Sequence, residues 1–199
     1  MNEKIFKTLC GEIHYWINME QGSGNITLIF LPGLTADHRL FEKQIEFFQG
    51  KYNVFVWDAP GHGKSWPFKF DFSLMAKWLD DIFGLENIQA PVIIGQSMGG
   101  YVGQAYSELF PNKLKGFVSI DSAPLQRKYV TGIELWLLKR MEPVYRYYPW
   151  KSLLNIGTKG VAVSAYGRKL MHDIMMAYDG DQKRYAQISG HGFRILAEA

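Results

Sequence analysis

Ser97 is the residue of this sequence best placed to do chemistry. It stands at the centre of Gly95–Gly99, which reads Gly-Gln-Ser-Met-Gly. The apolar run Val92–Ile94 precedes this pattern, and apolar residues at helical spacing follow it. Such a context favours a sharp strand–turn–helix that pushes the serine hydroxyl outward, because glycines remove Cβ atoms where strand and helix crowd together. The alternative is an ordinary exposed serine in a glycine-rich connection.

Two further motifs precede the serine motif. They are Leu31–Leu34, which reads Leu-Pro-Gly-Leu, and Asp58–Ser65, which reads Asp-Ala-Pro-Gly-His-Gly-Lys-Ser. Together the three motifs resemble the α/β-hydrolase family, in which the serine motif is the nucleophile elbow. The resemblance implies a serine hydrolase that cleaves an ester or related acyl bond with Ser97 as nucleophile. It also implies that the backbone N–H groups of Met98 and Leu34 form the oxyanion hole.

The acid and the base of a catalytic triad are less clearly marked. Asp121 ends a strand-like run, the position of the triad carboxylate in some branches of the family, haloalkane dehalogenases among them; in most branches it comes one strand later. Asp121 is therefore a candidate acid, and the alternative is a polar residue that shapes the site. His62 precedes Ser97, against the family's order of serine, acid and histidine, so we expect it to shape a loop. His172 and His191 fall in cap-like segments, so neither is expected to act as the base. His172 should lie on a helix, whereas His191 has glycines on both sides, which permit unusual backbone conformations and make it the better candidate of the two.

No metal or cofactor is predicted. The sequence contains no cysteine cluster, and its five histidines lack the spacing of metal ligands. His38 is interpreted as an exposed loop or first-turn residue. The glycines of Gly95–Gly100 are explained by the elbow, so they do not indicate a phosphate-binding loop.

The predicted fold class is α/β, with a mostly parallel sheet and flanking helices. Nearly continuous apolar runs such as Ile26–Leu31 are typical of strands covered on both faces. Strand-like runs at 5–9 and 12–17 predict an N-terminal antiparallel hairpin at one sheet edge. Apolar residues at helical spacing over 74–82 predict a helix, and Ser73 is the expected N-cap.

The predicted organisation divides the chain in two. Residues 1–125 are expected to form the N-terminal part of the α/β-hydrolase core, and residues 126–199 a helical cap or lid after the sixth strand. No continuous strand-like run follows Asp121. Because the family's fold continues with two more strand–helix units, which usually hold the acid and the histidine, we expect these last units to be missing. The chain would then lack its triad histidine and be inactive as an esterase.

Composition restricts the partners. The 199 residues are 47% hydrophobic and carry a net charge of +3 that is scattered along the chain, so no nucleic-acid partner is predicted. The N-terminus lacks the apolar region of a signal peptide and no apolar run is long enough to cross a bilayer, so we expect a cytoplasmic protein with no membrane partner. The single cysteine, Cys10, excludes an internal disulfide and is predicted to be buried.

The expected substrate is a small-molecule ester or other acyl compound, apolar or aromatic. Self-association through an open sheet edge is a further expectation. Two other function classes stay open: a non-catalytic binding or scaffold protein with this fold, and another reaction of the fold such as C–C bond hydrolysis, lyase chemistry or haloperoxidase chemistry. Most aromatic residues of the predicted cap are expected to pack, and one or two to line a substrate pocket; they are Trp136, Tyr145, Tyr147, Tyr148 and Trp150.

Overall fold

The structure, a computed structural model, describes residues 1–19, 26–125 and 133–198. One six-stranded sheet runs in the order β1-β2-β4-β3-β5-β6. β1 and β2 form an antiparallel hairpin at one edge, β2 is antiparallel to β4, and the other neighbouring pairs are parallel. The predicted mostly parallel sheet with its N-terminal hairpin is therefore confirmed. The strands are β1 (Asn2–Lys7), β2 (Glu12–Asn18), β3 (Ile26–Leu31), β4 (Asn53–Trp57), β5 (Ala90–Gln96) and β6 (Gly116–Ile120).

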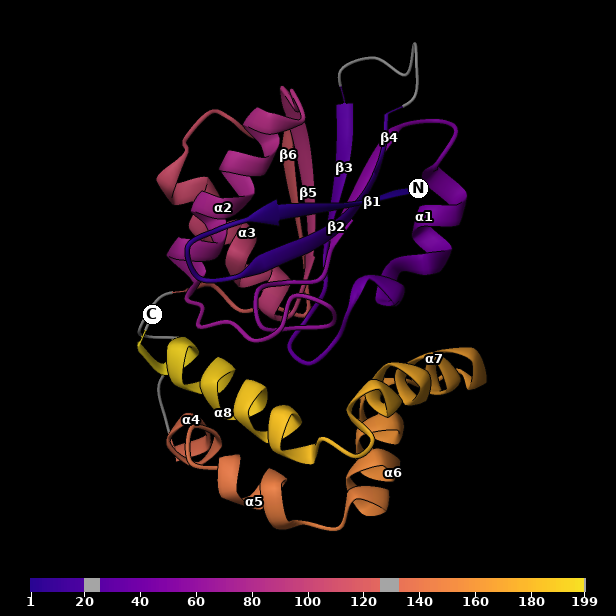
Figure 1. Cartoon of the computed structure of the whole chain (residues 1–199), viewed down its shortest axis with the longest axis vertical. Helices are drawn as coiled ribbons and strands as arrows, with labels where there is room; N and C mark the ends of the chain where they lie inside the picture. The colour runs from indigo at the N-terminus through magenta and orange to yellow at the C-terminus, as the bar shows by residue number, and fades with distance from the viewer. Residues whose placement is uncertain (20–25, 126–132, 199) are drawn as a thin grey trace.

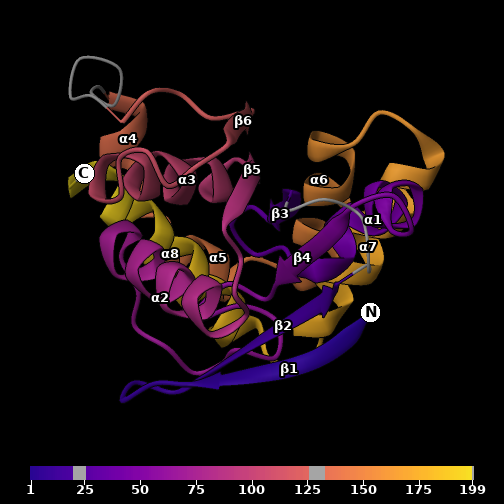
Figure 2. The same ribbon diagram turned by 90° about the horizontal axis from the view of Figure 1, so that it is seen from above.

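Helices cover both faces of the central strands. α2 (Phe72–Leu85) and α3 (Met98–Leu109) lie on one face, and α1 (Glu42–Phe48) lies on the other (Figure 2). The larger hydrophobic cluster joins the first face to α2 and α3, and a smaller one joins the second face to α1. Burial on both sides explains why the inner strands read as nearly continuous apolar runs.

Apart from the 3₁₀ helix η1 (His38–Phe41), which leads into α1, the remaining described helices form a separate group beyond one end of the sheet (Figure 1). The longest, α8, lies closest to the sheet, and its Ile195 joins the larger hydrophobic cluster. None of these helices, nor any other helix of the described residues, is long and apolar enough to cross a membrane. The group, called here the C-terminal helices, consists of α4 (Ile133–Leu138), α5 (Glu142–Tyr147), α6 (Trp150–Val161), α7 (Ala165–Met175), the 3₁₀ helix η2 (Met176–Tyr178) and α8 (Gln182–Glu198).

The predicted division between core and cap falls after residue 125. The segment that follows it, residues 126–132, lies outside the described residues. At the sheet edge opposite the hairpin, β6 pairs with β5 alone among the described strands. Its Val118 and Ile120 side chains are 47% and 41% exposed. Self-association through this edge stays a prediction.

Two local predictions were wrong. Cys10 is exposed, because it lies in the hairpin turn, where its N–H donates to the Thr8 hydroxyl, and not in a strand. The N-cap of α2 is Asp71 and not Ser73: the Asp71 carboxylate accepts the Leu74 N–H at 2.7 Å. The helix therefore begins two residues earlier than Ser73 would require, and Ser73 lies within its first turn.

The cap of α2 gives a direct test of this local structure. Replacing Asp71 by Ala should lower the free energy of unfolding by about 1 kcal/mol, because an amide N–H of the first turn loses its acceptor. Ser73→Ala is the matched control and should have little effect. Urea unfolding of both variants measures the difference, and a larger loss in Ser73→Ala would contradict the assignment.

Candidate active site

Ser97 lies at the junction of β5 and α3 in a strained backbone conformation. Its φ is 50° and its ψ is −115°, a region that non-glycine residues rarely adopt. The Ser97 N–H donates to the Ile120 carbonyl at 2.8 Å, and the Gly100 N–H donates to the Ser97 carbonyl at 2.9 Å. Bonds to β6 and to α3 thus hold the serine in this turn, with its side chain half-buried.

The two glycines of the motif are required by close backbone contacts. A Cβ on Gly95 would lie 2.3 Å from the Gly99 carbonyl oxygen, and a Cβ on Gly99 would lie 2.0 Å from the Leu31 carbonyl oxygen. Both distances are far below van der Waals contact, and the obstacles are backbone atoms. The structure therefore supports the steric reason that the sequence suggested for these glycines.

The segment after β3 lies beside the serine. A Cβ on Gly33 would lie 3.2 Å from the Ser97 Cβ, and Leu34 follows directly. The turn is closed by a 3.1 Å hydrogen bond from the Ala36 N–H to the Gly33 carbonyl, and Thr35 takes a left-handed φ of 62°. Met98 is the first residue of α3 on the other side of Ser97. The residues predicted to form the oxyanion hole therefore lie on the two segments that adjoin Ser97.

Asp121 directly follows β6 and is exposed, with a left-handed φ of 54°. Its two neighbours both bond to the serine: the Ile120 carbonyl accepts the Ser97 N–H, and the Ser122 hydroxyl donates to the Ser97 carbonyl at 2.8 Å. Asp121 is thus close to the elbow along the chain. No histidine of the described residues is hydrogen-bonded to it.

All five histidines are described, and the recorded hydrogen bonds of their rings go to groups other than Ser97. His172 lies on α7, the helix expected for it, and His191 lies within α8 despite the glycines on either side of it. The partners are the Glu3 carboxylate for His14, the Asp58 carboxylate for His38, the Pro60 carbonyl for His62, the Asp173 carboxylate for His172 and the Phe70 carbonyl for His191.

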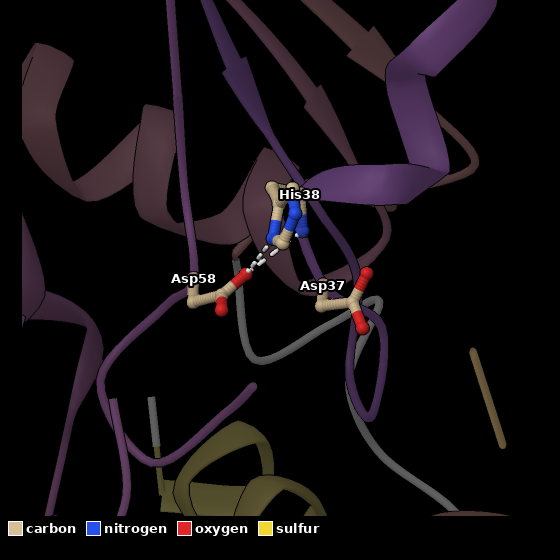
Figure 3. A group of neighbouring side chains, drawn as sticks. All are labelled: Asp37, His38 and Asp58. Atoms are coloured by element: carbon tan, nitrogen blue, oxygen red, sulfur yellow. Dashed lines mark hydrogen bonds and ion pairs between the residues drawn. The ribbon is translucent and has the colours of Figure 1, made fainter. Parts of the chain in front are cut away.

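A cluster of Asp37, His38 and Asp58 is the closest approach to a metal site in the described residues (Figure 3). The Asp58 carboxylate accepts hydrogen bonds from the backbone N–H of His38 and of Lys64, and it also contacts the His38 ring Nδ1 at 2.8 Å. Asp37 turns away from this pair and binds the Arg39 guanidinium. Because the carboxylate oxygens are already used, the cluster braces two loops and offers little to a cation.

Asp58 also explains the glycine-rich motif that it begins. A Cβ on Gly63, whose φ is 46°, would lie 2.1 Å from an Asp58 carboxylate oxygen, so only glycine fits. The Ser65 hydroxyl at the end of the motif donates to the Asp58 carbonyl and accepts the His14 N–H. The sequence indicated this loop through its motif but gave no sign that His38 would pair with Asp58.

His62 lies inside this loop and is fully buried. Its Nδ1 is 3.1 Å from the Pro60 carbonyl oxygen, so this nitrogen carries the proton, and Nε2 has no partner among the described residues. Burial lowers the pKa of His62 to about 4. A neutral, enclosed ring that packs against Phe70 agrees with the loop-shaping role predicted for it.

A cavity of about 530 Å³ lies between the segment 66–70 and α8. Three rings, those of Trp66, Phe68 and Phe70, contribute to its lining together with His191 and Arg194, and Ser97 does not. Most of the five aromatic residues of the predicted cap are expected to pack and one or two to line a pocket, and none of the five lines this cavity. Tyr145 and Trp150 pack on Tyr185, whereas Trp136, Tyr147 and Tyr148 are exposed.

The buried His62 should make stability depend on pH. The unfolded chain protonates this group below a pKa of about 6.5, whereas the folded chain does so only below about 4. The folded state therefore loses stability as the pH falls between these values. We expect this group to cost about 2 kcal/mol between pH 7 and pH 5, measured by urea unfolding at both pH values.

A matched pair of variants isolates this effect. The loss between pH 7 and pH 5 should shrink in His62→Gln and persist in His172→Gln, because His172 is exposed on α7. An unchanged pH dependence in His62→Gln would show that other groups cause it.

Two curated relatives each match part of the chain. Pimeloyl-[acyl-carrier protein] methyl ester esterase of Wigglesworthia glossinidia brevipalpis is 27% identical over 120 residues, 59% of this chain and 45% of the relative. 3-Oxoadipate enol-lactonase 2 of Acinetobacter baylyi is 32% identical over 98 residues, 48% of this chain and 37% of the relative. The matches thus span less than half the length of these relatives.

Solved structures match the whole chain in fold. A thermophilic esterase from Thermogutta terrifontis superposes with a TM-score of 0.75 at 18% identity, over 100% of this chain and 73% of that one. The N-acyl homoserine lactonase AidH superposes with a TM-score of 0.70 at 20% identity, over 100% of this chain and 70% of that one. Residues 26–144 match the family model described as alpha/beta hydrolase fold. The chain therefore belongs to the α/β-hydrolase fold family.

Proposed function

We propose that Ser97 is the nucleophile of a hydrolase that acts on an ester or related acyl bond of a small molecule. The observation that carries this proposal is the strained backbone of Ser97, held between β5 and α3 by contacts that admit only glycine at two neighbouring positions. Strain of this kind concentrates at functional sites. The names of the relatives, an esterase and two lactonases among them, support an acyl bond as the target.

In the proposed reaction the Ser97 oxygen attacks the acyl carbon while a general base takes its proton, and the carbonyl oxygen becomes an oxyanion. The N–H groups of Met98 and Leu34 stabilise this charge. The intermediate collapses by breaking the bond to the alcohol, which leaves with that proton, and water then hydrolyses the acyl-serine in the same way to release the acid. The C-terminal helices act as a cap over the carboxyl ends of the strands, and residues 1–125 are the core. The cap encloses one side of the space that holds an apolar or aromatic acyl group. Asp121 remains a candidate for the triad acid.

The base is the part of the machinery that the described residues do not supply. Each recorded ring hydrogen bond of the five histidines goes to a group other than Ser97. An unactivated serine hydroxyl is a poor nucleophile at neutral pH. We therefore propose that the 199-residue chain by itself positions the nucleophile and the oxyanion donors but has little or no esterase activity.

The lack of a base among the described residues also supports a second candidate function, which is binding without catalysis. A protein with a positioned serine and no base could bind an acyl compound in the site without cleaving it. Other reactions of this fold use the same serine position, among them C–C bond hydrolysis, lyase chemistry and haloperoxidase chemistry. Only assays with substrates of each kind distinguish these reactions from ester hydrolysis.

Labelling with a fluorophosphonate probe tests the nucleophile and the base together. The purified chain should react slowly, because removing a triad member leaves only about 10³ to 10⁴-fold catalysis over water. Added imidazole should accelerate the reaction by acting as an external base. Mass spectrometry of the digested protein should place the label on Ser97.

Two serine variants complete this test. Ser97→Ala should abolish the labelling, whereas Ser107→Ala on α3 should keep it, because the Ser107 hydroxyl bonds to the Gly103 carbonyl of its own helix. Labelling that survives in Ser97→Ala would overturn the proposed nucleophile. Rapid turnover of p-nitrophenyl acetate by the 199-residue chain, lost in Ser97→Ala, would overturn the missing base.

A further inference from the structure

We infer that the C-terminal helices hold the turn at Gly33–Ala36 in the conformation that presents the Leu34 N–H to the oxyanion. In this role Tyr178 and Gly192 are positioning residues, and they contact neither Ser97 nor a substrate. The inference rests on the proposed function, since it assigns Leu34 to the oxyanion hole. The contacts themselves are independent of that assignment.

Tyr178 provides the first contact with the turn. Its hydroxyl donates to the Thr35 carbonyl at 3.2 Å, and the ring is 3% exposed. Thr35 is one of few non-glycine residues with a left-handed φ in the described chain. Such a conformation is unfavourable for a residue with a Cβ and persists only where its surroundings determine it. A buried hydroxyl bonded to the Thr35 carbonyl is such a determinant.

Gly192 of α8 provides the second contact. A Cβ on Gly192 would lie 2.4 Å from Leu34 Cδ1 and 2.8 Å from Leu34 Cδ2. The α8 backbone therefore lies directly against the side chain of the proposed oxyanion residue. A larger residue at position 192 would have to displace Leu34 or push the helix away.

Tyr185 of α8 supports the first contact by packing against Tyr178. The ring of Tyr185 packs edge-on against Tyr178 at 5.5 Å and against Trp150 at 5.5 Å. The Tyr178 hydroxyl that bonds to the Thr35 carbonyl thus belongs to a packed aromatic group, which fixes its ring.

Two contacts, one from η2 and one from α8, therefore fall on adjacent residues of one short turn. Other contacts between these helices and the core, such as the hydrogen bond from the Tyr166 hydroxyl to the Glu42 carboxylate, lie elsewhere. This difference gives a matched control. Tyr166→Phe removes a hydroxyl that joins the helices to the core without touching the turn.

Hydrogen–deuterium exchange of residues 31–37 tests the inference without requiring activity. Tyr178→Phe should speed exchange of these amides by about fivefold, the effect of one net hydrogen bond on a local opening equilibrium. Gly192→Ala should also speed it by displacing Leu34. Tyr166→Phe and Gly160→Ala should leave it unchanged, since a Cβ on Gly160 meets open space. Unchanged exchange in both Tyr178→Phe and Gly192→Ala would overturn the inference.

Imidazole-assisted labelling of Ser97 gives the functional readout. In Tyr178→Phe the limiting rate of labelling should fall by about fivefold while the half-saturating probe concentration stays the same, because the oxyanion forms only in the transition state. A higher half-saturating concentration with an unchanged limiting rate would show instead that Tyr178 shapes the binding space. If Ser97 is not labelled in any variant or in the parent chain, the proposed function is wrong. The hydrogen–deuterium exchange comparison would still decide whether the helices hold the turn.

Discussion

The closest contact at the site is between backbones: α3 approaches the ends of β3 and β5 so closely that no side chain fits between them. A Cβ on Gly99 would meet the Leu31 carbonyl, and one on Gly95 would meet the Gly99 carbonyl. This approach sets where α3 begins and therefore where Ser97 lies. It also brings the end of β3, and with it Leu34, alongside the serine.

The close approach of α3 to the strands could be predicted because the residues that cause it lie near one another in the sequence. Glycine spacing, an apolar run before it and helical periodicity after it occur within about twenty residues, so the elbow and its glycines follow from elementary sterics. The same is true of the sheet, whose inner strands are apolar throughout because both faces are covered. The N-cap of α2 shows the limit of local reasoning: Asp71 and Ser73 are both good caps, and only the folded structure decides between them.

Contacts between distant residues could not be predicted in this way. The pairing of His38 with Asp58 needs two loops to meet, and the contact of Gly192 with Leu34 joins positions more than 150 residues apart. Neither has a motif of its own. The roles of the histidines could be predicted only in part. Chain order argued against His62 as the catalytic base, but the burial that lowers its pKa depends on how Phe70 and the loop pack around the ring.

The obstacles that reserve positions 95 and 99 for glycine are main-chain oxygens, which every amino-acid sequence carries. Side chains around the elbow can therefore change over evolutionary time without moving the serine, provided the two glycines remain. A lineage could exchange its activating groups, or lose them, while inheriting the same geometry. The position of a nucleophile and the ability to use it are then separately heritable traits in this fold.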